Sequence, residues 1–203
     1  MFPPEALYII PAVLLTVVLY TTWKGWRFRT ALREAAETLS CTYQKDSWFS
    51  TGTVRGIRRG RVVEISLLKQ GAGSFQRQLT EIRVTARATV TTSFMIGLEN
   101  TLTRVQRTAG WHDIEIGQEP FDSVMLIQSE DEDWMKRQLN DAVVKALLTA
   151  RIGASDLRID AQGVTWRRAR RIMDPHRIVE AVERAEAVVE TLHHRATPRD
   201  DLG

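Results

Sequence analysis

The sequence predicts an α+β fold, in which an N-terminal transmembrane helix and an amphipathic stalk precede one mainly antiparallel sheet domain with two C-terminal amphipathic helices. Three observations predict it: an uncharged apolar run opens the chain, apolar and polar residues alternate through much of 42–128, and two later stretches have the helical period. The expected parts are a short non-cytoplasmic N-terminus (1–5), a transmembrane helix (6–23), a juxtamembrane amphipathic helix (24–40), a single cytoplasmic α+β domain (41–195) and a disordered tail (196–203).

The apolar run, Ala6 to Trp23, contains no charged residue. Its length of roughly 27 Å as a helix matches the hydrocarbon core of a bilayer. A cleaved signal peptide and a buried helix of a folded domain are the alternatives, but basic residues follow this run instead of preceding it, and it has no polar face. By the positive-inside rule we expect a single-pass signal-anchor protein of a bacterial inner membrane, with the N-terminus outside. The expected membrane-interface residues are Tyr8, Trp23 and Trp26.

The period then changes along the chain. Apolar residues at helical spacing from Phe28 to Leu39 predict that the helix continues as a stalk. Residues 53–69 alternate on both sides of Arg59-Gly60, which is typical of a β-hairpin. Residues 101–108 have no clear period, and a Gly- and Ser-rich loop is expected at 70–76. Further strands are expected at 79–90, 94–99, 111–116 and 123–128.

The C-terminal third predicts two helices around a second hairpin. The acidic run Glu130 to Asp133 opens a helix expected to reach Ala150, because carboxylates stabilise a helix N-terminus. Strands at 157–160 and 164–168 form the hairpin. Asp174 and Pro175 are typical of the N-cap and first position of the last helix. The apolar seam of that helix is compatible with packing on the sheet, which we favour, or with pairing to a partner helix.

Charge is segregated along the chain, although the net charge is only +3. Residues 24–61 hold nine basic side chains against three acidic ones, and 111–150 hold nine acidic against three basic. The basic clusters could face lipid, or form ion pairs with the acidic helices. Nucleic acid is not expected, because few aromatic residues accompany them. The candidate anion- or lipid-binding residues are Lys24, Arg27, Arg29, Arg33, Arg55, Arg58, Arg59, Arg61, Arg167, Arg168, Arg170 and Arg171.

Catalytic and metal-binding signatures are missing from the sequence, so we expect no catalytic residue, no metal and no cofactor. His112 and Asp113 would point to opposite faces of a strand and could not form a dyad. Cys41 has no neighbouring cysteine or activating histidine. The Gly-x-Gly at 71–73 matches neither the phosphate-binding loop nor the dinucleotide fingerprint.

The order of an anchor, strands, the segment Gln118 to Asp122, a further strand, an acidic N-cap and an amphipathic helix resembles bacterial single-pass membrane-tethered proteins of unknown function. The resemblance covers about residues 110–170. It implies no activity and assigns no role to any residue.

The expected function is a membrane-anchored cytoplasmic binding or scaffolding module with a basic membrane-proximal surface. An enzyme is not favoured, but the alternative is a membrane-tethered enzyme that acts on a phosphate-bearing or anionic substrate through the arginine clusters. The expected partners are the lipid bilayer and another protein, with anionic lipid as a further candidate.

Overall fold

One antiparallel sheet organises the chain, with strands in the order β1-β2-β3-β4-β8-β7-β5-β6. The computed structural model describes residues 6–45, 50–71, 77–86, 92–98 and 113–193. The strands are β1 (Thr42–Gln44), β2 (Thr53–Arg58), β3 (Arg61–Gln70), β4 (Arg77–Thr85), β5 (Phe94–Leu98), β6 (Met125–Ser129), β7 (Asp156–Asp160) and β8 (Gly163–Ala169). The helices are α1 (Ala6–Thr38), α3 (Glu132–Gln138), α4 (Asp141–Ala150) and α5 (Pro175–His193).

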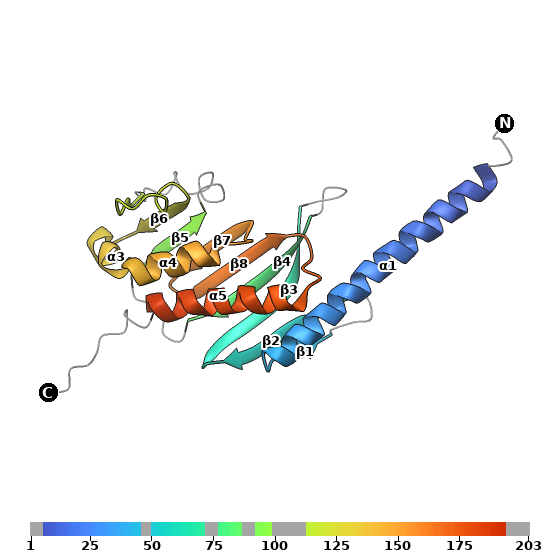
Figure 1. Ribbon diagram of the computed structural model, residues 1–203, viewed down its shortest axis with the longest axis horizontal. Helices are drawn as coiled ribbons and strands as arrows, with labels where there is room; N and C mark the ends of the chain where they lie inside the picture. The colour runs from blue at the N-terminus through green and yellow to red at the C-terminus, as the bar shows by residue number, and fades with distance from the viewer. Residues whose placement is uncertain (1–5, 46–49, 72–76, 87–91, 99–112, 194–203) are drawn as a thin grey trace.

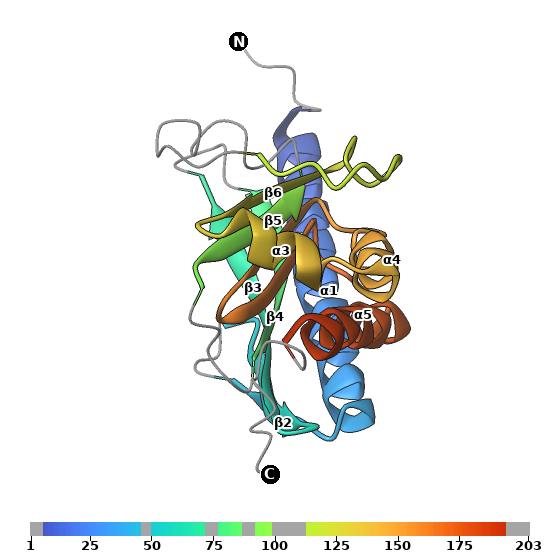
Figure 2. The same cartoon turned by 90° about the vertical axis from the view of Figure 1, so that its left-hand side faces the viewer.

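Helices α1, α4 and α5 lie on one side of the sheet (Figure 2). The apolar seam of α5, from Ile178 to Leu192, is buried against β4, β8, α4 and α1, so this helix packs on the sheet as favoured. The last turns of α1 join the same core through Phe28 and Leu32, whereas its N-terminal half projects away from the sheet (Figure 1). The core therefore lies between the sheet and this helical layer.

The predicted transmembrane helix is corrected by the structure. In the described part of the chain, no helix has the length and apolar character that a membrane span requires. From Pro11, where described side chains begin, to Trp23 the uncharged part of α1 rises about 20 Å, and charged residues follow from Lys24. This finding overturns the transmembrane helix over 6–23 and the single-pass, signal-anchor and inner-membrane localisation inferred from it.

The second half of α1 is amphipathic as expected, but it is not a free stalk. Phe28, Leu32, Ala35 and Leu39 are each at most 2% exposed, because they pack into the core of the domain. This part of α1 therefore shares one hydrophobic core with the sheet.

The order of strands in the sheet differs from their order in the sequence. The hairpin β2–β3 forms around Arg59 and Gly60, both with positive φ, as the two-residue turn requires. The hairpin β7–β8 lies between β4 and β5 in the sheet. The strands predicted at 79–90 and 94–99 are neighbours in the sequence, but they are therefore not neighbours in the sheet. β1 was not predicted, and it extends the sheet at the edge beside β2.

Two local predictions differ from the structure. The helix expected to run to Ala150 is broken into α3 and α4, because the Asn140 side chain accepts hydrogen bonds from the backbone N–H groups of Ala142 and Val143 and starts a new helix. In the described residues after β6 there are therefore three helices instead of two. The described end of the strand expected at 111–116 is a loop with one bridge, from Asp113 to Gln128. The predictions for 1–5, 72–76, 87–90, 101–108, 111–112 and 194–203 lie outside the described residues.

Candidate anion-binding site

The connection between β8 and α5 crosses the end of β4 and is fixed to it. Arg170 donates its N–H to the Gln78 carbonyl at 2.9 Å, and the Thr80 hydroxyl donates to the Arg170 carbonyl at 3.0 Å. The same hydroxyl oxygen accepts the N–H of Ile172 at 3.1 Å. Arg170 has a φ of 92°, a conformation that residues other than glycine rarely adopt. These bonds hold an unusual turn in which arginine side chains follow one another closely.

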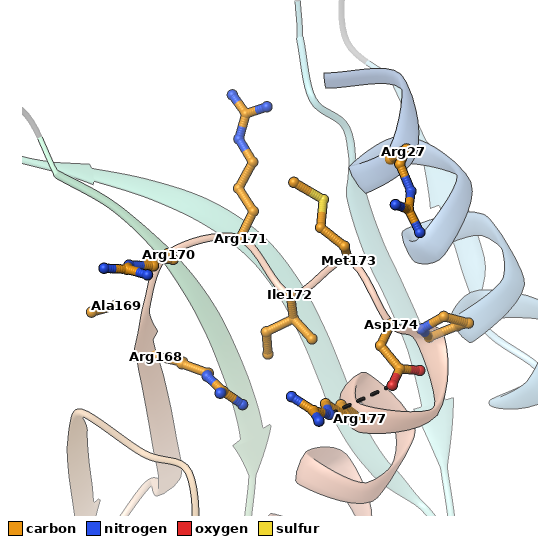
Figure 3. A pocket seen from close by; sticks show the side chains of 10 residues that line it. Arg27, Arg168, Ala169, Arg170, Arg171, Ile172, Met173, Asp174 and Arg177 are labelled. Carbon is orange, nitrogen blue, oxygen red and sulfur yellow. Dashed lines mark ion pairs between the residues drawn. The ribbon is translucent and has the colours of Figure 1, made fainter. Parts of the chain in front are cut away.

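This connection borders a hollow of about 720 Å³, which we call the basic pocket (Figure 3). Arg27 of α1 lines it from across the hollow, and five residues from the end of β8, the connection and the first turn of α5 supply its other charged groups. A second hollow of about 650 Å³, the α1 hollow, lies between α1 and the same connection. Since Arg170, Arg171 and Met173 line both, the two hollows adjoin. The charged residues lining the basic pocket are Arg27, Arg168, Arg170, Arg171, Asp174 and Arg177.

Arg171 is held at the boundary between the two hollows. Its Nε donates to the Gln78 side-chain oxygen at 2.7 Å, and its guanidinium carbon lies 5.9 Å from the centre of the Phe28 ring. Burial lowers the pKa of Arg171, and the neighbouring positive charge of Arg29 lowers it further. An anion placed here would offset both effects.

Positive charge exceeds negative charge in the basic pocket. Asp174 is the one carboxylate among the described lining residues, and it pairs with Arg177 at 3.5 Å. Arg168 near the end of β8 and Arg170 and Arg171 of the connection are together called the loop arginines. Within the described part of the chain, none of the three has an ion pair with a carboxylate. We therefore regard this pocket as the candidate site, because it presents several guanidinium groups and no free acid to balance them.

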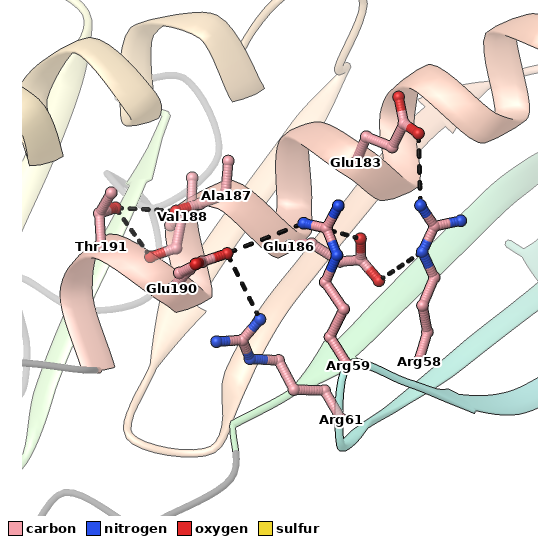
Figure 4. A network of polar contacts seen from close by, with 9 residues as sticks. All are labelled: Arg58, Arg59, Arg61, Glu183, Glu186, Ala187, Val188, Glu190 and Thr191. Atoms are coloured by element: carbon pink, nitrogen blue, oxygen red, sulfur yellow. Dashed lines mark hydrogen bonds and ion pairs between the residues drawn. The ribbon is translucent and has the colours of Figure 1, made fainter.

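The hairpin-tip arginines, Arg58, Arg59 and Arg61, are arranged differently. They form ion pairs with glutamates of α5 (Figure 4). Arg58 lies 3.2 Å from Glu186, whose side chain is fully buried, and Arg61 lies 3.8 Å from Glu190. Burial raises the pKa of Glu186, while the three guanidinium groups lower it. The positive charge of the hairpin tip is thus balanced within the protein.

Replacing Glu186 with alanine is expected to lower the free energy of unfolding by about 3 kcal/mol, because it removes the fully buried carboxylate that pairs with the partly buried guanidinium group of Arg58. Glu190→Ala is the control. Glu190 is more than half exposed and pairs with Arg59 and Arg61 at a longer distance of 3.8 Å, so its loss should cost below about 1 kcal/mol. Urea unfolding of the two variants measures this difference. Equal losses of unfolding free energy in the two variants would mean that the burial of Glu186 does not strengthen its ion pairs.

The other predicted site residues are distributed over the fold. Arg55 pairs with Glu64 at 2.9 Å, and Arg167 contacts both Glu81 and Asp156 on the sheet. Lys24 lines the α1 hollow, Arg29 is half-buried near Arg171, and Arg33 lies over the Tyr43 ring. Trp23 and Trp26 are exposed, while the side chain of Tyr8 lies outside the described residues.

Thr21, Gln78, Met173 and Arg177 also line the two hollows, and they are not among the site residues predicted from the sequence. Arg177 could have been found, because it lies in the first turn of a predicted helix that follows an arginine cluster. Gln78 carries no such signal, since its role depends on the pairing of β4 with a segment about 90 residues later.

No group of three or more His, Cys, Asp or Glu residues in the described part of the chain could hold a metal ion. The Asp131 carboxylate caps α3 by accepting the N–H of Trp134 at 2.8 Å, as its position predicted. Burial raises the pKa of the Cys41 thiol, which makes it a poorer nucleophile at neutral pH. The acids near Arg58 are engaged in ion pairs.

The fold and site define a sheet domain with one helical layer and a basic pocket at the end of β8. No family model matches the chain, and no curated protein matches it. The chain is similar to the crystal structure of the mycobacterial trehalose monomycolate transport factor A, TtfA, with a TM-score of 0.60 and 14% sequence identity. The match covers 84% of this chain and 96% of that chain. At this identity the likeness shows a common fold alone.

Proposed function

We propose that this protein is a non-catalytic binding module that takes an anionic ligand into the basic pocket as part of a transport process. The observation that carries the proposal is the charge imbalance of the pocket, where the loop arginines face a single carboxylate that already pairs with Arg177. The fold is shared with a protein named as a transport factor, which supports the transport part of the proposal.

Phosphate, sulfate and carboxylate groups suit such a pocket. A guanidinium group presents a planar set of donors that can engage two oxygens of one anion at once. The loop arginines lie on a segment fixed by backbone hydrogen bonds to β4, so little backbone ordering remains to be done when a ligand binds. Each charge-assisted hydrogen bond contributes about 1.5–3 kcal/mol, so two or three of them would suffice for specific binding.

The test measures binding of inorganic phosphate to the full chain by titration calorimetry at low salt. The pocket variant carries Arg168→Ala, Arg170→Ala and Arg171→Ala. The control variant carries Arg55→Ala, Arg83→Ala and Arg158→Ala, which removes the same charge from exposed, ion-paired positions on the sheet. We expect the pocket variant to bind at least tenfold more weakly and the control less than twofold.

Two results would contradict the proposal. Absence of phosphate binding to the unaltered chain would remove the anion site. Equal weakening in the two triple variants would show that net charge, and not the pocket, attracts the anion.

A further inference from the structure

The projecting half of α1 exposes apolar side chains on the N-terminal side of Thr21, Lys24 and Arg27, which line the two hollows. Six residues from Val13 to Leu19 are 53–61% exposed, and they are Val13, Leu14, Leu15, Val17, Val18 and Leu19. Soluble proteins seldom expose a continuous apolar surface of this kind unless it binds a partner or a ligand.

The threonine hydroxyl groups on this part of α1 donate hydrogen bonds to the backbone of the same helix. Thr16 donates to the Ala12 carbonyl at 2.8 Å, and Thr21 and Thr22 donate to the Val18 carbonyl at 3.0 and 2.9 Å. Because each hydroxyl satisfies its donor on its own helix, the surface can meet hydrocarbon without leaving these donors unpaired.

Helical spacing connects one face of this surface to the site. Leu14, Val17, Thr21 and Lys24 follow one another at intervals of three, four and three residues, so they lie on one side of α1. Thr21 and Lys24 line the α1 hollow, which adjoins the basic pocket. An apolar stripe therefore leads down the helix into the arginine cluster, while Leu15 and Leu19 lie on the other side of the helix.

The residues where stripe and pocket meet are amphipathic. The Lys24 ammonium lies 4.2 Å from the centre of the Tyr20 ring, and the Arg27 guanidinium lies 5.2 Å from that of Trp23. Met173, whose flexible thioether fits irregular apolar contacts, lines both hollows. The charged and apolar surfaces are thus continuous.

We infer that the ligand of the basic pocket is an anionic amphiphile, with its charged head group at the loop arginines and its alkyl chain along Leu14 and Val17. The inference rests on the proposed function and specifies its ligand class. A partner helix or a second copy could cover the apolar stripe, but an apolar surface would not balance the arginines. A free anion would balance the arginines but leave the stripe exposed. An amphiphile does both.

The probe is dodecyl phosphate, used below its micelle concentration with the full chain and compared with inorganic phosphate. Each buried methylene group adds about threefold to fourfold in affinity, so we expect dodecyl phosphate to bind at least a hundredfold more tightly. The stripe variant Leu14→Ser with Val17→Ser should bind dodecyl phosphate at least tenfold more weakly and inorganic phosphate unchanged. The matched control, Leu15→Ser with Leu19→Ser, removes exposed apolar area from the other side and should change either affinity less than threefold.

The outcomes separate the two proposals. If dodecyl phosphate binds no more tightly than inorganic phosphate, the amphiphile inference fails and the anion site stands. If neither probe binds, both fail. Equal losses in the two serine variants would also overturn the inference, because the chain would then not follow one face of α1. Sedimentation of the unaltered chain as a dimer that only the stripe variant dissociates would assign the stripe to a second copy instead.

Discussion

Alanine at Gly163 is expected to lower the free energy of unfolding by roughly 3–5 kcal/mol, which is large for the addition of one methyl group. Gly163 begins β8 and has a φ of +143°, where side chains other than hydrogen are strained. A Cβ there would collide with the Val84 carbonyl oxygen and lie 2.9 Å from the Thr85 Cα. Both atoms belong to β4, so the methyl group would force apart the strands that carry the site.

The control for this prediction is Gly117→Ala. Gly117 also has positive φ, at +74°, but a Cβ there would meet no atom within 4 Å. Its substitution should cost only the conformational strain of about 1–2 kcal/mol. Thermal unfolding followed by circular dichroism measures both variants. If the Gly163 variant is no less stable than the Gly117 variant, the close approach of β4 to Gly163 does not determine stability.

Local features of the fold could be predicted wherever a short stretch of sequence decides the outcome. The turn at Arg59 and Gly60, the second hairpin and the N-terminus of α5 depend on residues within a few positions of one another, and the structure contains them. The seam of α5 faces the core because its spacing offers only one apolar side.

Long-range features could not be read in the same way. The position of β7 and β8 between β4 and β5 depends on pairings between segments up to about 90 residues apart, and alternation within a strand does not name its partner. The first half of α1 was wrongly predicted to span a membrane. An uncharged run predicts an apolar helix, but it does not show that this helix projects from a folded domain. Its second half is amphipathic in the sequence, but only packing shows that it belongs to the core.

The two arginine clusters looked equivalent in the sequence and differ in the structure. Glu183, Glu186 and Glu190 follow one another at helical spacing, so they lie on one side of α5 and can meet the hairpin tip. That acidic stripe was visible in the sequence, but its partner was not. The loop arginines lack a comparable stripe among the described residues, and this difference selects their pocket as the candidate site.

Trp166 fixes the strand that leads into this pocket. Its side chain is among the largest fully buried ones, and its Nε1 donates to the Ala150 carbonyl at 3.0 Å. Ala150 ends α4, where carbonyl groups no longer find a partner within the helix. The indole thus packs in the core and satisfies a buried helix terminus at the same time.

Trp166→Ala is therefore expected to lower the free energy of unfolding by about 3–5 kcal/mol, because it removes a large buried ring. Trp166→Phe keeps an aromatic ring and loses the donor, so it should cost about 1–3 kcal/mol for the unpaired Ala150 carbonyl. Urea unfolding gives both values, and phosphate titration of the phenylalanine variant reports on the pocket. Since Trp166 does not line the pocket, that variant should retain phosphate affinity within twofold. A large loss of affinity at nearly full stability would show instead that the indole, and not the β4 hydrogen bonds, holds the loop arginines in place.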